Sequence, residues 1–122
     1  MADTNKFALI TLRYDYLSDR NEGRDSIDTS IYGLIADIGL TPLLVPNNPE
    51  NLECLFNLVA ESIALVVFTG GNTLSFLDPS DTSCHLPREE VDEFLYSKCL
   101  ELSIPMLGIC RGMQYISHKL GF

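Results

Sequence analysis

Hydrophobic runs alternate with helical patterns along the chain. Four short, apolar, β-prone runs predict strands at residues 7–12, 41–45, 63–68 and 104–109. The segments between them carry apolar residues at helical spacing, and this alternation is typical of βαβ units with right-handed crossovers. The run 63–68 is apolar throughout, as expected for a strand buried on both faces of a parallel sheet. The pattern predicts an α/β fold, a doubly wound, flavodoxin-like parallel sheet with flanking helices and strand order 2-1-3-4.

Four helices are predicted between and after these strands. Isoleucine and leucine recur at helical spacing in the first, which ends at Gly39 and has Asp25 or Ser26 as its predicted N-cap. The predicted helices occupy residues 27–38, 52–59, 88–102 and 113–120.

Two polar segments, 13–24 and 76–87, are predicted to be loops. The first follows the carboxyl end of a strand, where open α/β sheets bind their ligands. Tyr14, Tyr16 and Arg20 are therefore candidate substrate contacts, and a plain surface connection is the alternative interpretation.

Charge excludes several classes of partner. Eight basic residues against 17 acidic ones give a net charge of −9, which argues against nucleic acid and against an anionic membrane surface. No apolar run reaches membrane-spanning length, and the start of the chain, residues 1–5, lacks the basic and apolar parts of a signal peptide. We expect a single domain located in the cytoplasm.

The four cysteines show no metal-binding spacing, so neither a metal nor another cofactor is expected. Cys84 is followed by His85, but nothing nearby completes a zinc site. Cys54 and Cys99 are predicted to lie in helix cores and Cys84 in a loop. Cys110 is the predicted functional thiol.

Cys110 has glycines two residues before and two residues after it, Gly108 and Gly112. The sequence G-x-C-x-G is the cysteine counterpart of a nucleophile elbow, a sharp strand-to-helix turn in which side chains next to the nucleophile would clash. At a helix N-terminus the dipole favours a thiolate, and the N–H of Arg111 is available to an oxyanion. A buried core cysteine is the alternative.

A second glycine motif, Gly70-Gly71, follows the third predicted strand. Glycines at such a turn allow backbone N–H groups to approach a ligand closely. The segment lacks the Gly-Lys-Ser/Thr of a phosphate loop and the G-x-G-x-x-G of a dinucleotide site. A glycine turn without a ligand is the alternative.

Residues 105–114 read P-x-L-G-I-C-R-G-x-Q, which closely resembles the elbow of class I glutamine amidotransferases, and within them the gamma-glutamyl-hydrolase branch (peptidase C26). The resemblance implies a catalytic nucleophile at Cys110, oxyanion-binding N–H groups at Gly71 and Arg111, and substrate contacts from Gly70, Asn72 and Gln114. An Arg-Asp-x-x-Glu pattern in this branch is matched by Arg88, Glu89 and Asp92, with the two acids exchanged.

The catalytic His and Glu of this family form a His-x-Glu that is absent from this chain. His118 lies about 12 Å along its helix from the elbow, too far to act as the base, and His85 does not match the position of the family's base. The resemblance therefore implies that residues 1–122 are the N-terminal half of a class I glutamine amidotransferase-like domain, incomplete at the C-terminal side.

The implied function is cysteine-dependent hydrolysis of a gamma-glutamyl amide on a small-molecule substrate, with a synthetase or acceptor domain as a further candidate partner. These 122 residues alone are expected to be inactive. A non-catalytic remnant or binding module that retains the elbow fold is the alternative, and the related stress-protein group of cysteine hydrolases fits less well. Residues 70–75 are also similar to enzymes of surface-saccharide assembly, which remove glutamyl groups from nucleotide-linked intermediates. The predicted edge strand 104–109 leads us to expect self-association.

Overall fold

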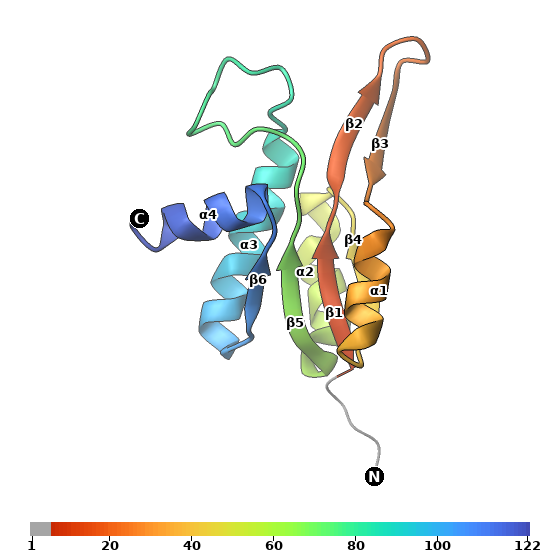
Figure 1. The fold of residues 1–122 in the computed structure, drawn as a ribbon, viewed down its shortest axis with the longest axis vertical. Helices are drawn as coiled ribbons and strands as arrows, with labels where there is room; N and C mark the ends of the chain where they lie inside the picture. Colours follow the sequence, from red (N-terminus) through yellow and green to blue (C-terminus); the bar gives the residue numbers. More distant parts are fainter. Residues whose placement is uncertain (1–5) are drawn as a thin grey trace.

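The computed structural model describes residues 6–122 and contains a parallel sheet of four strands (Figure 1). The strand order is β4-β1-β5-β6, which confirms the predicted order 2-1-3-4. The strands are β1 (Phe7–Thr11), β4 (Thr41–Val45), β5 (Ile63–Phe68) and β6 (Met106–Gly108). Residues 1–5, in which the sequence shows no signal peptide, lie outside the described part.

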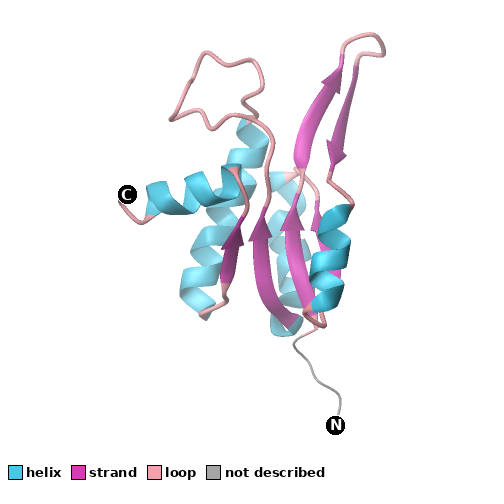
Figure 2. Ribbon diagram, in the orientation of Figure 1, coloured by secondary structure: helices cyan, strands magenta, loops and turns pink. Residues whose placement is uncertain are grey.

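Helices cover both faces of this sheet, as predicted (Figure 2). Side chains alternate along a strand, so Leu9 and Val66 face one side while Ala8 and Val67 face the other. The helical elements are α1 (Ser30–Asp37), α2 (Pro49–Val59), the 3-10 turn η1 (Ala60–Ser62), α3 (Leu86–Leu102) and α4 (Arg111–Lys119). Helix α1 packs on one face, whereas α2, α3 and part of α4 contribute to the core on the other.

The predicted loop after β1 is wrong, because this segment forms an antiparallel hairpin. It consists of β2 (Arg13–Leu17) and β3 (Glu22–Ser26), which form a separate two-stranded sheet. The hairpin extends beyond the carboxyl end of the main sheet (Figure 1). Its residues are half-buried or exposed on both sides, so the sequence carries no apolar alternation that would have indicated strands. Asn21 makes the turn with a positive φ of 49°.

Helix α1 begins later than predicted. Asp25 and Ser26 end β3 and cannot cap it, and the helix starts at Ser30, whose N–H donates to the Asp28 carboxylate at 2.9 Å. Gly39 follows the helix with a φ of +81°, a conformation that suits a residue without a side chain.

Cys54 and Cys99, which were both predicted to lie in helix cores, differ in burial. Cys99 is buried in α3 as predicted, and burial raises the pKa of its thiol to about 12. Cys54 is exposed, so its predicted core position is wrong. The buried stripe of α2 runs through Leu52 and Phe56, which leaves Cys54 on the outer side. Cys84 lies in the loop before α3.

Across residues 6–122, the structure contains no helix whose length and apolar character would let it cross a membrane. The same residues contain no group of three or more His, Cys, Asp or Glu side chains that could hold a metal ion.

Candidate functional site

Cys110 connects β6 to α4 at the carboxyl edge of the sheet. Its backbone angles are φ 52° and ψ −109°, a region that residues with a side chain rarely adopt. Such a conformation costs about 1–3 kcal/mol and persists only where the surroundings impose it. The thiol is exposed, so this cysteine is strained and accessible, unlike a core cysteine.

The two glycines that flank Cys110 are required by close packing. A Cβ on Gly112 would lie 1.9 Å from the carbonyl oxygen of Phe68, and a Cβ on Gly108 would lie 2.7 Å from the backbone of Gly112 and Met113. Helix α4 therefore meets the ends of β5 and β6 backbone to backbone. The spacing G-x-C-x-G follows from this contact, because any larger residue would push the helix away.

The Gly70-Gly71 loop lies directly beside Cys110. A Cβ on Gly70 would be 3.5 Å from the Cβ of Cys110, and Gly71 has a φ of +89°. Within residues 6–122, no protein acceptor takes the backbone N–H of Gly70, Gly71, Asn72 or Arg111. Unpaired N–H donors close to a thiol can stabilise a negative charge, and here they come from the loop that adjoins Cys110 and from the residue that follows it.

Arg88, on α3, holds this loop through its carbonyl groups. Its Nη1 donates to the carbonyl oxygens of Gly70 (2.9 Å) and Gly71 (3.0 Å), and its Nη2 donates to that of Thr69 (2.9 Å). The side chain is fully buried. Burial lowers the pKa of Arg88 to about 9, which leaves the guanidinium charged at neutral pH.

Two more α3 residues connect to the site. Asp92 forms a buried ion pair with Arg111, with 2.7 Å between Oδ2 and Nη1 and exposed fractions of 0% and 4%. Burial raises the pKa of Asp92, and the Arg111 guanidinium opposes that rise. Glu89 accepts hydrogen bonds from the Ser75 N–H (3.1 Å) and hydroxyl (2.6 Å). All three residues of the matched Arg-Glu-x-x-Asp pattern thus contact the site or its loop.

Asn72 joins the glycine loop to the hairpin. Its Oδ1 accepts from the Tyr14 N–H (2.8 Å) and from Arg88 (3.0 Å), and its Nδ2 donates to the carbonyls of Tyr14 (2.8 Å) and Ser83 (2.9 Å). An amide has two donors and two acceptor sites, so protein partners use them all. The Asn72 side chain thus has a structural role, and the substrate contact expected from Asn72 stays a prediction.

A cavity of about 600 Å³ opens beside Cys110, between the hairpin, the start of α1 and the glycine loop. Its polar wall includes Arg13, Asp15, Ser26, Asp28 and Ser30, and its apolar wall Ile27, Ile31, Leu34 and Ile109. Gly70, Gly71 and Cys110 close the remaining side. Of the predicted substrate-binding residues Gly70, Asn72 and Gln114, only Gly70 lines this cavity, and Gln114 is exposed.

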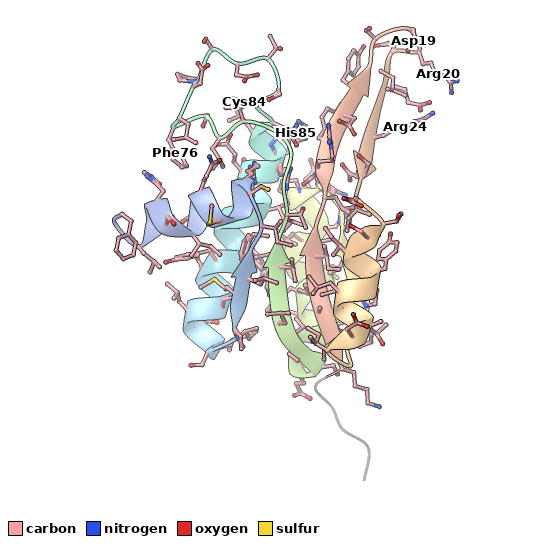
Figure 3. The ribbon with its side chains drawn as sticks, viewed as in Figure 1. Asp19, Arg20, Arg24, Phe76, Cys84 and His85 are labelled. Carbon is pink, nitrogen blue, oxygen red and sulfur yellow. The ribbon has the colours of Figure 1, made fainter. Side chains whose placement is uncertain are left out.

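The three hairpin residues predicted as candidate substrate contacts lie outside this cavity. Tyr14 stacks on His85 with ring centroids 3.8 Å apart, the Tyr16 hydroxyl bonds to Asn21, and Arg20 lies in the turn at the tip (Figure 3). None of the three predicted contacts lines the cavity. Their neighbours Arg13 and Asp15 do so, because side chains alternate along a strand. The alternation becomes informative only once the segment is known to be a strand.

Neither histidine forms a hydrogen bond with Cys110. His85 ends the loop before α3 and stacks against Tyr14 of the hairpin (Figure 3), and burial lowers its pKa. His118 is exposed and stacks on Phe76, with ring centroids 3.8 Å apart. That neither histidine acts as the base stays a prediction.

The sequence of this chain is similar to known proteins. The model of the Peptidase C26 family matches residues 11–121, which is most of the chain and includes the elbow. The chain belongs to the peptidase C26 family. This confirms the predicted resemblance to class I glutamine amidotransferases.

Two curated relatives share the sequence over shorter stretches. The "Gamma-glutamyl-CDP-amidate hydrolase" of Campylobacter jejuni is 40% identical over 70 residues, which cover 57% of this chain and 34% of that protein. The "GMP synthase [glutamine-hydrolyzing]" of Acetivibrio thermocellus is 43% identical over 56 residues, 46% of this chain and 9% of that protein. The matched part of this peptidase C26 member thus spans about a third or less of each relative.

Proposed function

We propose that this chain carries the nucleophile and the oxyanion hole of a cysteine-dependent gamma-glutamyl amide hydrolase. The Cys110 thiolate attacks the side-chain carbonyl carbon, and the carbonyl electron pair moves to the oxygen, which the N–H groups of Gly71 and Arg111 stabilise. The C–N bond then breaks, the leaving amine takes a proton from solvent water, and a further water hydrolyses the thioester to release glutamate and free Cys110.

The observation that carries this proposal is the surroundings of Cys110. The thiol is exposed on a strained backbone, and N–H groups without a protein acceptor among residues 6–122 occur in the two adjoining segments, the Gly70-Gly71 loop and the start of α4. A structural cysteine needs neither feature. Membership of peptidase C26 and the gamma-glutamyl substrate in the name of one relative support the same reaction class.

The substrate that we favour is a gamma-glutamyl amide attached to a nucleotide. The name "Gamma-glutamyl-CDP-amidate hydrolase" supports this choice. Hydrolysis would then release glutamate and an anionic nucleotide amide. The proposed link to surface-saccharide assembly rests on the similarity of residues 70–75 to enzymes of that process, and the expected location in the cytoplasm agrees with such a substrate.

The proposal is tested by labelling the four cysteines with a diazo-ketone analogue of glutamine. Peptide mass spectrometry should find Cys110 modified ahead of Cys54, Cys84 and Cys99. Cys54 is the internal control, because it is also exposed but lies in α2, away from the site. Equal labelling of Cys54 and Cys110 would contradict an activated nucleophile.

Turnover by these 122 residues should be very low, because they lack the family's His-x-Glu. Loss of the general base typically costs orders of magnitude in rate even where the oxyanion hole survives. Glutamate release that Cys110→Ser abolishes would show that another group acts as the base. A chain that binds glutamine analogues without any Cys110 modification would favour the alternative, a non-catalytic binding module.

A further inference from the structure

We propose that helix α3 sets the geometry of the oxyanion hole by holding its two halves with two buried side chains. Arg88 is the positioning residue for the Gly71 N–H, and Asp92 is the positioning residue for Arg111. The inference rests on the proposed function for the identity of the two donors. It assigns roles to two residues that touch neither the substrate nor the thiol in the proposed reaction.

The role of Arg88 follows from the geometry of the peptide bond. The carbonyl of Gly70 and the N–H of Gly71 belong to one peptide group, and all peptide bonds in residues 6–122 are trans, so the two groups point in opposite directions. The Nη1 of Arg88 donates to the Gly70 carbonyl at 2.9 Å, which holds this peptide group in one orientation. The Gly71 N–H is thereby directed away from α3.

The same argument applies to the neighbouring peptides. Arg88 also binds the carbonyls of Thr69 (2.9 Å) and Gly71 (3.0 Å), which directs the N–H groups of Gly70 and Asn72 away from the guanidinium as well. Three successive carbonyls thus converge on one cation while three successive N–H groups remain unpaired. Glycines at 70 and 71 would otherwise let these peptides rotate freely.

The ion pair between Asp92 and Arg111 positions the other donor, the Arg111 N–H. Arg111 is the first residue of α4, where backbone N–H groups have no partner within the helix. Its guanidinium is held by Asp92 at 2.7 Å, and both side chains are almost completely buried. Breaking such a pair would leave a buried charge without compensation, so the start of α4 is fixed to α3.

Arg88 and Asp92 are four residues apart on the same helix, so they lie on the same face of it, one turn apart. The distance between the two donor segments is therefore set by one rigid element and not by the loops themselves. Catalytic hydrogen-bond donors must be held in place before the charge develops, and this arrangement supplies that rigidity from outside the site.

The test compares two reagents for Cys110 in Arg88→Lys and in the control Glu93→Gln. Lysine keeps the charge but cannot spread its donors over three carbonyls. Glu93 bonds Tyr115 and Lys119 of α4, so the control weakens an α3–α4 contact without touching the anchor of either donor. The nitrile analogue of glutamine, 2-amino-4-cyanobutanoate, adds to the thiol and places a nitrogen that accepts hydrogen bonds in the oxyanion hole. Iodoacetamide alkylates the thiol without using the hole.

Arg88→Lys should weaken the affinity for the nitrile by about 100-fold, with the rate of iodoacetamide alkylation changed by less than about twofold. Glu93→Gln should change neither by more than about twofold. A parallel loss with both reagents, or an unchanged nitrile affinity, overturns the inference. If Arg88→Lys does not fold, Asp92→Glu, which lengthens the second contact and keeps its charge, should show the same selective loss.

A failure of the proposed function has a different signature. In that case the unmodified chain reacts with iodoacetamide but does not bind the nitrile at all. The inference is then decided by the ¹⁵N order parameter of the Gly71 amide. A fall below about 0.6 in Arg88→Lys, absent in Glu93→Gln, supports positioning by Arg88, and an unchanged value overturns it.

Discussion

The two faces of the sheet are filled very differently. Among residues 6–122, the core between the sheet and helices α2 and α3 contains 13 buried residues, whereas the core on the α1 side contains four, Ala8, Ile10, Ile35 and Val67. On the α1 side, Leu34 and Ile38 are 43% and 53% exposed, and Leu107 of β6 is 37% exposed.

This difference separates the rigid part of the candidate site from its open part. Arg88 and Asp92, which hold the donor segments around Cys110, come from a helix of the densely packed face. The cavity, by contrast, is bounded by α1 and the half-exposed hairpin. Donors that stabilise a developing charge need a fixed position, whereas a wall that admits a substrate does not. The side chains that hold the donor segments therefore come from the face of the sheet that buries more apolar residues.

The largest expected effect is a loss of stability on the dense face. Phe56 is 1% exposed and packs edge-on against Phe94, with ring centroids 5.7 Å apart. Phe56→Ala should lower the free energy of unfolding by about 3–5 kcal/mol, measured by urea denaturation. Leu34→Ala on the open face should cost less than about 1 kcal/mol, because a side chain that is nearly half exposed loses little buried area. Similar losses for both would contradict the comparison.

Most of this fold could be predicted from the sequence, because its elements are marked by apolar periodicity. The strand 63–68 is buried on both faces and reads as a continuous apolar run. The hairpin could not be predicted, since β2 and β3 bury no complete face. Cys54 is exposed although it lies in a helix, because the buried face of α2 is defined by Leu52 and Phe56 and Cys54 falls outside it.

For the candidate site, the sequence predicted the elbow around Cys110 but not the contacts by which other residues hold the glycine loop. G-x-C-x-G signals the elbow because close backbone contact leaves room only for glycine. The pattern around Arg88 matches the family, yet nothing in the sequence says that one guanidinium binds three successive carbonyls. That contact joins residues 17–19 positions apart and depends on tertiary structure. For the same reason, the four side-chain hydrogen bonds of Asn72 to Tyr14, Ser83 and Arg88 could not be foreseen.

The second prediction concerns association through the open face. The strand order makes β6 an edge of the sheet, and Leu107 is an exposed apolar residue on that edge. Unprotected edge strands and bare apolar patches favour pairing with another chain. We expect the 122-residue chain to self-associate at micromolar concentration in sedimentation velocity, and Leu107→Lys to shift it towards the monomer. A compact monomer without the substitution would contradict this prediction.

The smallest expected effect is a pH dependence at the contact between α3 and α4. Glu93 accepts hydrogen bonds from the Tyr115 hydroxyl (2.6 Å) and from the Lys119 ammonium (2.7 and 2.9 Å). The Lys119 bond, followed by the Tyr115 bond, lowers the pKa of Glu93 below its usual 4.5. A carboxyl group whose pKa is lower in the folded chain stabilises it fully above the unfolded value, and this contribution is lost as the pH falls through the folded value.

Glu93→Gln should therefore reduce the free energy of unfolding at pH 7 by less than about 1 kcal/mol, because the pair is exposed to water and partly screened. The difference between the two proteins should shrink as the pH falls below 4.5, the usual pKa of the group. Urea denaturation at pH 7 and at pH 3 measures it, with Glu90→Gln, an exposed acid on the same helix, as the control. An unchanged difference at pH 3 would mean that the contact stabilises through packing of the side chains, and the charge of Glu93 would then add nothing to the hold of α3 on α4.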